Sequence, residues 1–296
     1  MWLVLWGWTG AAAAVAAWAV PRFLAAHQLT ALNYRKQPIP LGSGLAVWIT
    51  VAAHSMFLSV AVGDEWMFPS LPVAATVVFL AGWLDDTVGD VDVKGLRGHW
   101  QALRYEARLT TGTLKALAAA GAALWMSTLL AGALPSMRSM DVLGTAATTL
   151  IWLVRWCLAF LLMCLSANAL NLLDLRPGRA LKGFFVMGGV VLLGSVWQDA
   201  LFEALVCLLP VLLSALCLFR QDIRAHSMLG DSGANLLGFI TGFAVAAYTS
   251  WLVQIWVVTV LIVLHWAAER ISLSEVIDRT GLLYWLDRLG RADRQS

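Results

Sequence analysis

Long apolar stretches separated by short polar loops are the feature that most constrains how this chain can fold. A helix that crosses a bilayer needs roughly 20 mostly apolar residues, and fewer where neighbouring helices cover its ends. Nine stretches meet this requirement: Trp2–Val20, Leu41–Val62, Phe68–Leu84, Ala107–Ala131, Ala147–Leu170, Leu181–Val196, Ala200–Phe219, Ala234–Ser250 and Trp251–Ala267. Lipid cannot hydrogen-bond to the backbone, so each stretch is expected to form a helix. The sequence therefore predicts an all-α polytopic membrane protein with about nine transmembrane helices.

The composition excludes several other classes of protein. Hydrophobic residues make up 60% of the chain and charged residues 13%, whereas soluble domains carry about 25% charged residues. A net charge of +2 gives no reason to expect a nucleic-acid partner. The four cysteines lie inside apolar stretches without the CxxC spacing of a metal site: Cys157, Cys164, Cys207 and Cys217. We interpret them as buried reduced thiols, forming neither disulfides nor a zinc site.

The distribution of basic residues predicts how the helices are oriented. Lysine and arginine accumulate in short cytoplasmic loops because they resist translocation. Alternate loops hold Arg22, Arg35, Lys36, Lys94, Arg97, Arg104, Arg176, Arg179, Arg220 and Arg224. The intervening loops hold Asp64, Glu65, Asp141 and Asp199, with Arg138 as their one basic residue. We therefore expect an external N-terminus, a cytoplasmic C-terminus and location in the cell membrane.

The chain is expected to form one transmembrane helical catalytic domain over residues 1–271, followed by a cytoplasmic tail over residues 272–296. The tail carries too many charges for a tenth span. Its apolar residues recur at helical spacing: Leu273, Val276, Ile277, Leu283 and Leu286. This pattern predicts an amphipathic helix that lies along the inner membrane surface.

Two adjacent carboxylates end the third apolar stretch, in Gly82-Trp83-Leu84-Asp85-Asp86, and Lys94 follows in the next loop. Adjacent carboxylates repel each other unless a cation lies between them, which favours a divalent metal or a raised pKa. The alternative is that Asp85 and Asp86 only end the helix at the water boundary.

Asn168, Asn171 and Asp174 form a polar face at the inner end of the fifth stretch. At about 100° per residue they fall within one arc of the helix, and a polar face turned toward lipid would be costly. The face is therefore expected to line a cavity, continuing into Arg176, Arg179 and Lys182. The alternative is a hydrogen-bonding patch between helices, followed by ordinary cytoplasmic basic residues.

Gly230-Asp231-Ser232-Gly233 opens the eighth stretch. Free N–H groups at a helix start favour anions such as phosphate, and Asp231 could hold an accompanying magnesium ion. A plain turn is the alternative for this motif alone. Because the topology puts all three acidic and polar clusters on the cytoplasmic side, together they favour phosphoryl transfer, in which a metal and basic groups hold phosphates.

These motifs, in their order and spacing, resemble those of the polyprenyl-phosphate N-acetylhexosamine-1-phosphate transferases, the family of the phospho-MurNAc-pentapeptide translocase and the GlcNAc-1-phosphate transferases. The resemblance implies transfer of a sugar-1-phosphate from a UDP-sugar to a polyprenyl phosphate at the cytoplasmic face, with release of UMP and dependence on Mg²⁺. Asp85 and Asp86 would act on the lipid phosphate as base and metal-site carboxylate, and Asp231 would bind magnesium. The substrate-binding residues would be Lys94, Asn168, Asn171, Asp174, Arg176, Arg179 and Lys182.

The sequence departs from the family pattern in two places. Relatives commonly continue Asp174 as Asp-Gly-x-Asp-Gly, but Leu175, Arg176 and Pro177 follow here. The family's histidine-rich loop and last helix are also missing, which argues against the peptidoglycan translocase itself. An alternative hypothesis is a non-catalytic homologue that binds polyprenyl phosphate or a partner enzyme. A transporter is a third and weaker alternative, and a homodimer is one assembly that the sequence allows.

Overall fold

The structure is a computed structural model that describes residues 1–61, 69–89, 102, 104–105, 109–133 and 145–291. Within these ranges nine long helices occur, one for each predicted apolar stretch: α1 (Trp2–Ala26), α2 (Gly44–Ala61), α3 (Leu71–Val88), α5 (Thr111–Ala133), α6 (Thr145–Leu173), α7 (Arg179–Val196), α8 (Leu201–Ile223), α9 (Gly230–Tyr248) and α10 (Trp251–Ala268). Eight of them are long and apolar enough to cross a membrane; α9 is as long but carries polar residues in its first turn. The protein is a multi-pass membrane protein, as predicted.

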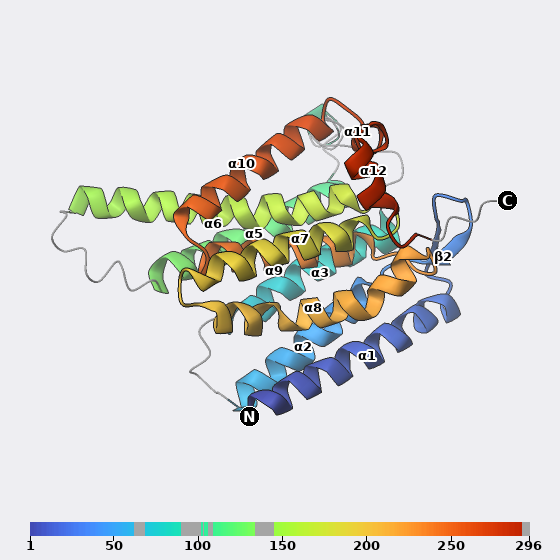
Figure 1. The fold of residues 1–296 in the computed structure, drawn as a ribbon, viewed down its shortest axis with the longest axis horizontal. Coiled ribbons are helices and arrows are strands. Elements are labelled where there is room, and N and C mark those ends of the chain that lie inside the picture. Colours follow the sequence, from blue (N-terminus) through green and yellow to red (C-terminus); the bar gives the residue numbers. More distant parts are fainter. Residues whose placement is uncertain (62–68, 90–101, 103, 106–108, 134–144, 292–296) are drawn as a thin grey trace.

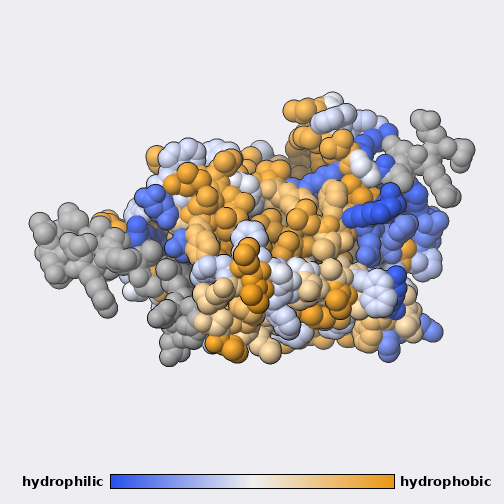
Figure 2. All heavy atoms as spheres, turned by 60° about the horizontal axis from the view of Figure 1, so that its bottom comes forward, coloured by the Kyte–Doolittle hydropathy of each residue, from blue (hydrophilic) through white to orange (hydrophobic). Residues whose placement is uncertain are grey.

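The long helices run roughly along one direction and form a single bundle (Figure 1). Figure 2 shows a broad apolar band around its middle, with hydrophilic residues gathered mainly at the end that carries the last short helices and the hairpin. This distribution is typical of a helical bundle whose lateral surface faces lipid.

Helix α9 is the centre of the bundle, and nearly all of its residues are buried. It packs against α6, α3, α2, α7 and α8. Gly238 and Gly242 lie against the α6 backbone, where an added Cβ atom would overlap the carbonyl oxygens of Ser166 and Leu162 respectively. Small residues four apart allow this close backbone approach between membrane helices. The close contact fixes α9 against α6.

Two features of the fold differ from the prediction. A short antiparallel hairpin, β1 (Thr30–Leu32) and β2 (Pro38–Pro40), occupies the first polar loop. The expected single tail helix is two short helices, α11 (Leu273–Arg279) and α12 (Gly281–Arg288). Thr280 between them has an extended backbone, and Gly281 follows it. Threonine and glycine both have low helix propensity, which favours a break at this point. The hairpin and α12 lie at the same end of the bundle (Figure 1).

Candidate active site

Asp86 caps the first turn of α9 from the neighbouring helix α3. One of its carboxylate oxygens accepts a hydrogen bond from the Asp231 N–H at 2.8 Å, and the other accepts from the N–H and hydroxyl of Ser232 at 3.0 Å and 2.6 Å. An acidic group is stabilising at a helix start because unpaired N–H groups point at it. Asp86 is therefore held firmly beside the start of α9.

Glycines permit this close contact between α3 and α9. Gly230 has a φ of +76°, and a Cβ atom there would lie 2.6 Å from an oxygen of Asp86. Gly82, one turn before the aspartate pair, would place a Cβ atom 2.7 Å from Ser232 Cα. Only a residue without a side chain fits at either position. The end of α3 and the start of α9 are therefore direct neighbours.

Lys115 of α5 lies between the carboxylates of Asp85 and Asp231. Its ammonium group donates to Asp85 Oδ2 at 2.7 Å and also to Asp231 Oδ2. The three side chains remain partly accessible, with exposures of 18% for Asp85, 31% for Asp231 and 16% for Lys115. The Lys115 ammonium group thus joins two carboxylates that lie 146 positions apart in the sequence. Such a centre has the charges needed to attract and hold a phosphate or a cation.

Sequence reasoning missed Lys115, although a signal was present. It is a single lysine near the start of an otherwise apolar membrane helix, and ionisable residues within membrane segments are usually functional or paired.

Asp174 joins this centre from the end of α6. Its carboxylate accepts a hydrogen bond from the Gly230 N–H at 3.1 Å. The pKa of Asp174 lies well above its ordinary value, because burial disfavours the charged form and neighbouring carboxylates, first that of Asp222, repel it. Asp222 of α8, which the sequence reasoning also missed, accepts a hydrogen bond from the Gly178 N–H at 2.7 Å. These contacts tie the loop between α6 and α7 to both α8 and α9.

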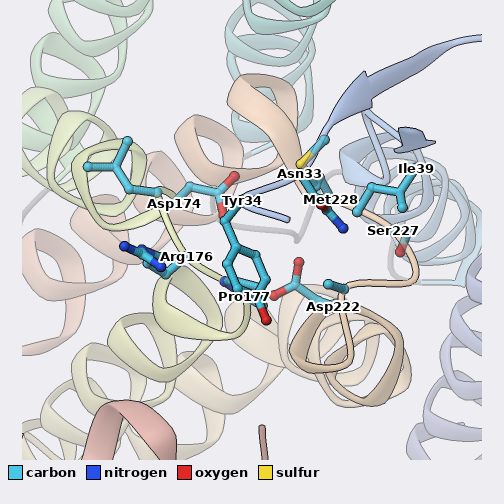
Figure 3. A pocket seen from close by; sticks show the side chains of 11 residues that line it. Asn33, Tyr34, Ile39, Asp174, Arg176, Pro177, Asp222, Ser227 and Met228 are labelled. Atoms are coloured by element: carbon cyan, nitrogen blue, oxygen red, sulfur yellow. The ribbon is translucent and has the colours of Figure 1, made fainter. Parts of the chain in front are cut away.

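A small pocket with a cavity volume of about 40 Å³ opens to the solvent beside Asp174. Residues of the hairpin turn, the α6–α7 loop and the α8–α9 connection line it: Asn33, Tyr34, Ile39, Asp174, Leu175, Arg176, Pro177, Asp222, Ala225, Ser227 and Met228. Figure 3 shows the Tyr34 ring beside Arg176, with the guanidinium carbon 5.6 Å from the ring centre. The pocket combines an aromatic face, an arginine and two carboxylates.

Some predicted site residues lie elsewhere. Lys94 falls outside the described residues. Asn168 is exposed, and within the described ranges no hydrogen bond joins its side chain or that of Asn171 to the acidic centre. Arg179 and Lys182 contact α12 instead of facing the pocket. The structure thus brings together Asp85, Asp86, Asp174, Arg176 and Asp231 from the predicted set.

The acidic centre fits a magnesium ion, which proteins usually hold with one or two carboxylates completed by substrate phosphates. Asp85 and Asp231 already direct oxygens toward one positive charge. Asp86 has less capacity to join them, because its oxygens accept three hydrogen bonds from α9. In the part of the chain that the structure describes, no group of three or more His, Cys, Asp or Glu side chains could hold a metal alone. Magnesium here would therefore need phosphate oxygens.

Fold and site together define a membrane-embedded protein with an acidic, lysine-containing centre at one end of its helical bundle. The family model for glycosyl transferase family 4 matches residues 68–250, more than half of the chain. None of the curated proteins compared with the chain matches it. The chain belongs to glycosyl transferase family 4 and is an enzyme of the polyprenyl-phosphate sugar-1-phosphate transferase family.

Proposed function

We propose that this enzyme transfers an N-acetylhexosamine-1-phosphate from a UDP-sugar to a polyprenyl phosphate at the cytoplasmic membrane face, releasing UMP in a Mg²⁺-dependent reaction. The observation that carries the proposal is the convergence of Asp85, Asp231 and Lys115 beside the start of α9. Family membership gives the reaction class. The resemblance in the sequence motifs gives the donor and the metal.

The reaction is a phosphoryl transfer between two anionic substrates. An oxygen of the polyprenyl phosphate forms a bond to the phosphorus of the UDP-sugar that carries the sugar. The bond between that phosphorus and the oxygen that bridges the two phosphorus atoms of the donor breaks. UMP leaves with the electron pair. Catalysis of such a step is mostly positioning and charge neutralisation. Magnesium, when bound, neutralises phosphate charge at this centre.

The chain's own residues have complementary roles in this scheme. Asp85 and Asp231 would hold the metal, and Lys115, which donates to both carboxylates, would bind a phosphate oxygen of the substrate. Asp86 is a positioning residue that fixes the start of α9, and its assignment to the metal stays a prediction. The N-terminal end of α9 itself favours anions.

The pocket beside Asp174 is the proposed donor side of the site. Tyr34 offers a ring face on which a base could stack, and Arg176 offers a cation for a phosphate. Asn171 and Lys94 remain proposed donor-binding residues on the resemblance alone. In this proposal Tyr34 and Arg176 bind the uridine nucleotide, a role that relatives give to the second acidic residue after Asp174.

The test is an assay of the purified protein in liposomes that contain polyprenyl phosphate. The protein is supplied with Mg²⁺ and, separately, with UDP-GlcNAc, UDP-GalNAc, UDP-glucose or GDP-mannose, and released nucleoside monophosphate is measured. We expect UMP release from a UDP-N-acetylhexosamine, abolished by EDTA and restored by Mg²⁺. Release from GDP-mannose alone, or release unaffected by EDTA, would contradict the proposed donor or metal.

A further inference from the structure

Arg179 and Lys182 have the appearance of phosphate-binding residues in the sequence, but the structure uses them to hold the C-terminal tail. Arg179 forms two parallel hydrogen bonds with the carboxylate of Asp287, at 2.9 Å and 3.1 Å, and a third with the Ser274 hydroxyl at 3.1 Å. Lys182 donates to the carbonyl oxygens of Leu286 and Asp287 at 2.8 Å and 2.7 Å. Arg179 therefore contacts both α11 and α12, and Lys182 contacts α12.

The Arg179–Asp287 pair is buried, with 6% of the Arg179 side chain and 7% of the Asp287 side chain exposed. Burial raises the pKa of Asp287, but the hydrogen bond and charge of Arg179, together with Arg291, outweigh it, so the net pKa is lowered. A buried, bidentate pair of this kind is costly to break from one side, because the remaining charge is left without a partner. The tail is thus attached by a specific contact.

The same tail contact reaches the loop that lines the donor pocket. Arg291 donates to Asp287 at 2.7 Å and to the carbonyl oxygen of Pro177 at 2.9 Å. Pro177 itself lines the pocket with Asp174 and Arg176 (Figure 3). The loop over residues 174–178 therefore lies between the tail on one side and the pocket on the other.

The end of α8 completes this arrangement. Ile223 packs against Gly178 of the loop and Gly290 of the tail, where added Cβ atoms would lie 3.0 Å and 2.9 Å from its side chain. Because tail, loop and α8 share contacts, a displaced tail removes support from the loop that carries Asp174 and Arg176.

We propose that Asp287 is a positioning residue for donor binding: by joining Arg179 and Arg291 it holds the tail against the 174–178 loop and keeps the donor pocket in its binding shape. The inference rests on the proposed function for the identity of the donor. It assigns Arg179 and Lys182 to the tail, so these residues affect the donor only through the tail.

The test compares Asp287→Asn, Arg179→Gln and the double variant in full-length protein, with UDP-GlcNAc as donor. We expect each single variant to raise the KM for donor by about tenfold, since small misplacements near a site are costly, with turnover much less affected. The KM of the double variant should match that of the single variants, because the Arg179–Asp287 contact is lost in all three. Asp278→Asn is the matched control, since Asp278 is an exposed carboxylate on α11 of the same tail.

Trypsin cleavage at Arg279 and Arg288, followed through a C-terminal tag, measures tail docking independently of activity. Asp287→Asn and Lys182→Met should both speed cleavage, whereas Asp278→Asn should not. If Asp287→Asn leaves KM unchanged or lowers it while Arg179→Gln raises it, Arg179 binds the donor directly and the proposal is overturned. If wild-type protein releases no UMP, the proposed function fails. The cleavage assay then still tests the tail contact on its own. Unchanged cleavage of Asp287→Asn would overturn that contact, and faster cleavage would support it.

Discussion

Lys115 places a positive charge between two carboxylates of the acidic centre. It contacts Asp85 and Asp231, which lie on helices far from it in the sequence. No spacing rule links these positions, because the contacts depend on how α3, α5 and α9 pack. Its ammonium group occupies the position between two carboxylates where a divalent cation is proposed to bind.

Replacing Lys115 by methionine should separate metal binding from turnover. Without the ammonium group the two carboxylates repel each other, so Mg²⁺ should bind more tightly. Turnover should fall by about 100-fold or more, as when one group that stabilises transition-state charge is removed. Calorimetric titration with Mg²⁺ and the UMP-release assay measure the two effects. Weaker Mg²⁺ binding in the variant would show that Lys115 does not share the metal's position.

At the scale of elements, the apolar pattern of the sequence predicts the long helices well. Each of the nine predicted stretches overlaps one long helix, because a membrane segment has to satisfy its own backbone hydrogen bonds. The hairpin was not predicted, because the polar loop carries no comparable periodic signal. The break at Thr280 was not predicted, because apolar residues recur at helical spacing on both sides of it. The tail's use of Arg179 and Lys182 was equally hidden, since positive residues beside a membrane helix usually indicate topology only.

The close packing of α9 on α6 gives a test at this scale. Gly242→Ala should destabilise the protein by about 1–3 kcal/mol, because the new methyl group overlaps the Leu162 carbonyl oxygen and forces the backbones apart. Gly189→Ala on α7 is the control, since nothing lies within 4 Å of its added Cβ atom. Thermal unfolding in detergent measures both. Equal melting temperatures would contradict the proposed close contact.

For the whole molecule, the sequence predicts the gathering of the acidic and glycine motifs at one end, which the structure confirms through the contacts of Asp86 and Asp174 with the start of α9. It does not predict how the pocket is divided among the hairpin, the α6–α7 loop and α8. Those contacts join positions such as Gly178 and Asp222 across separate helices. They depend on three-dimensional packing and not on local periodicity.

Orientation in the membrane is tested with reporters at the two termini. A reporter fused after Ser296 should be cytoplasmic, because alternate loops are rich in lysine and arginine, and one before Met1 should be external. Alkaline phosphatase and green fluorescent protein fusions report opposite sides. Termini on the same side would require an even number of crossings and would rule out nine spanning helices.

The central claim is that Asp85 and Asp231 form one reaction centre although they lie on different helices. Its most direct test is UMP release in polyprenyl-phosphate liposomes by Asp85→Asn, Asp231→Asn and the double variant, with Asp278→Asn as control. Each single change should lower turnover by at least about 100-fold in folded protein, and the double variant should be little worse than the worse single, because both residues serve one transition state. Wild-type turnover and Mg²⁺ dependence in Asp231→Asn would contradict the account.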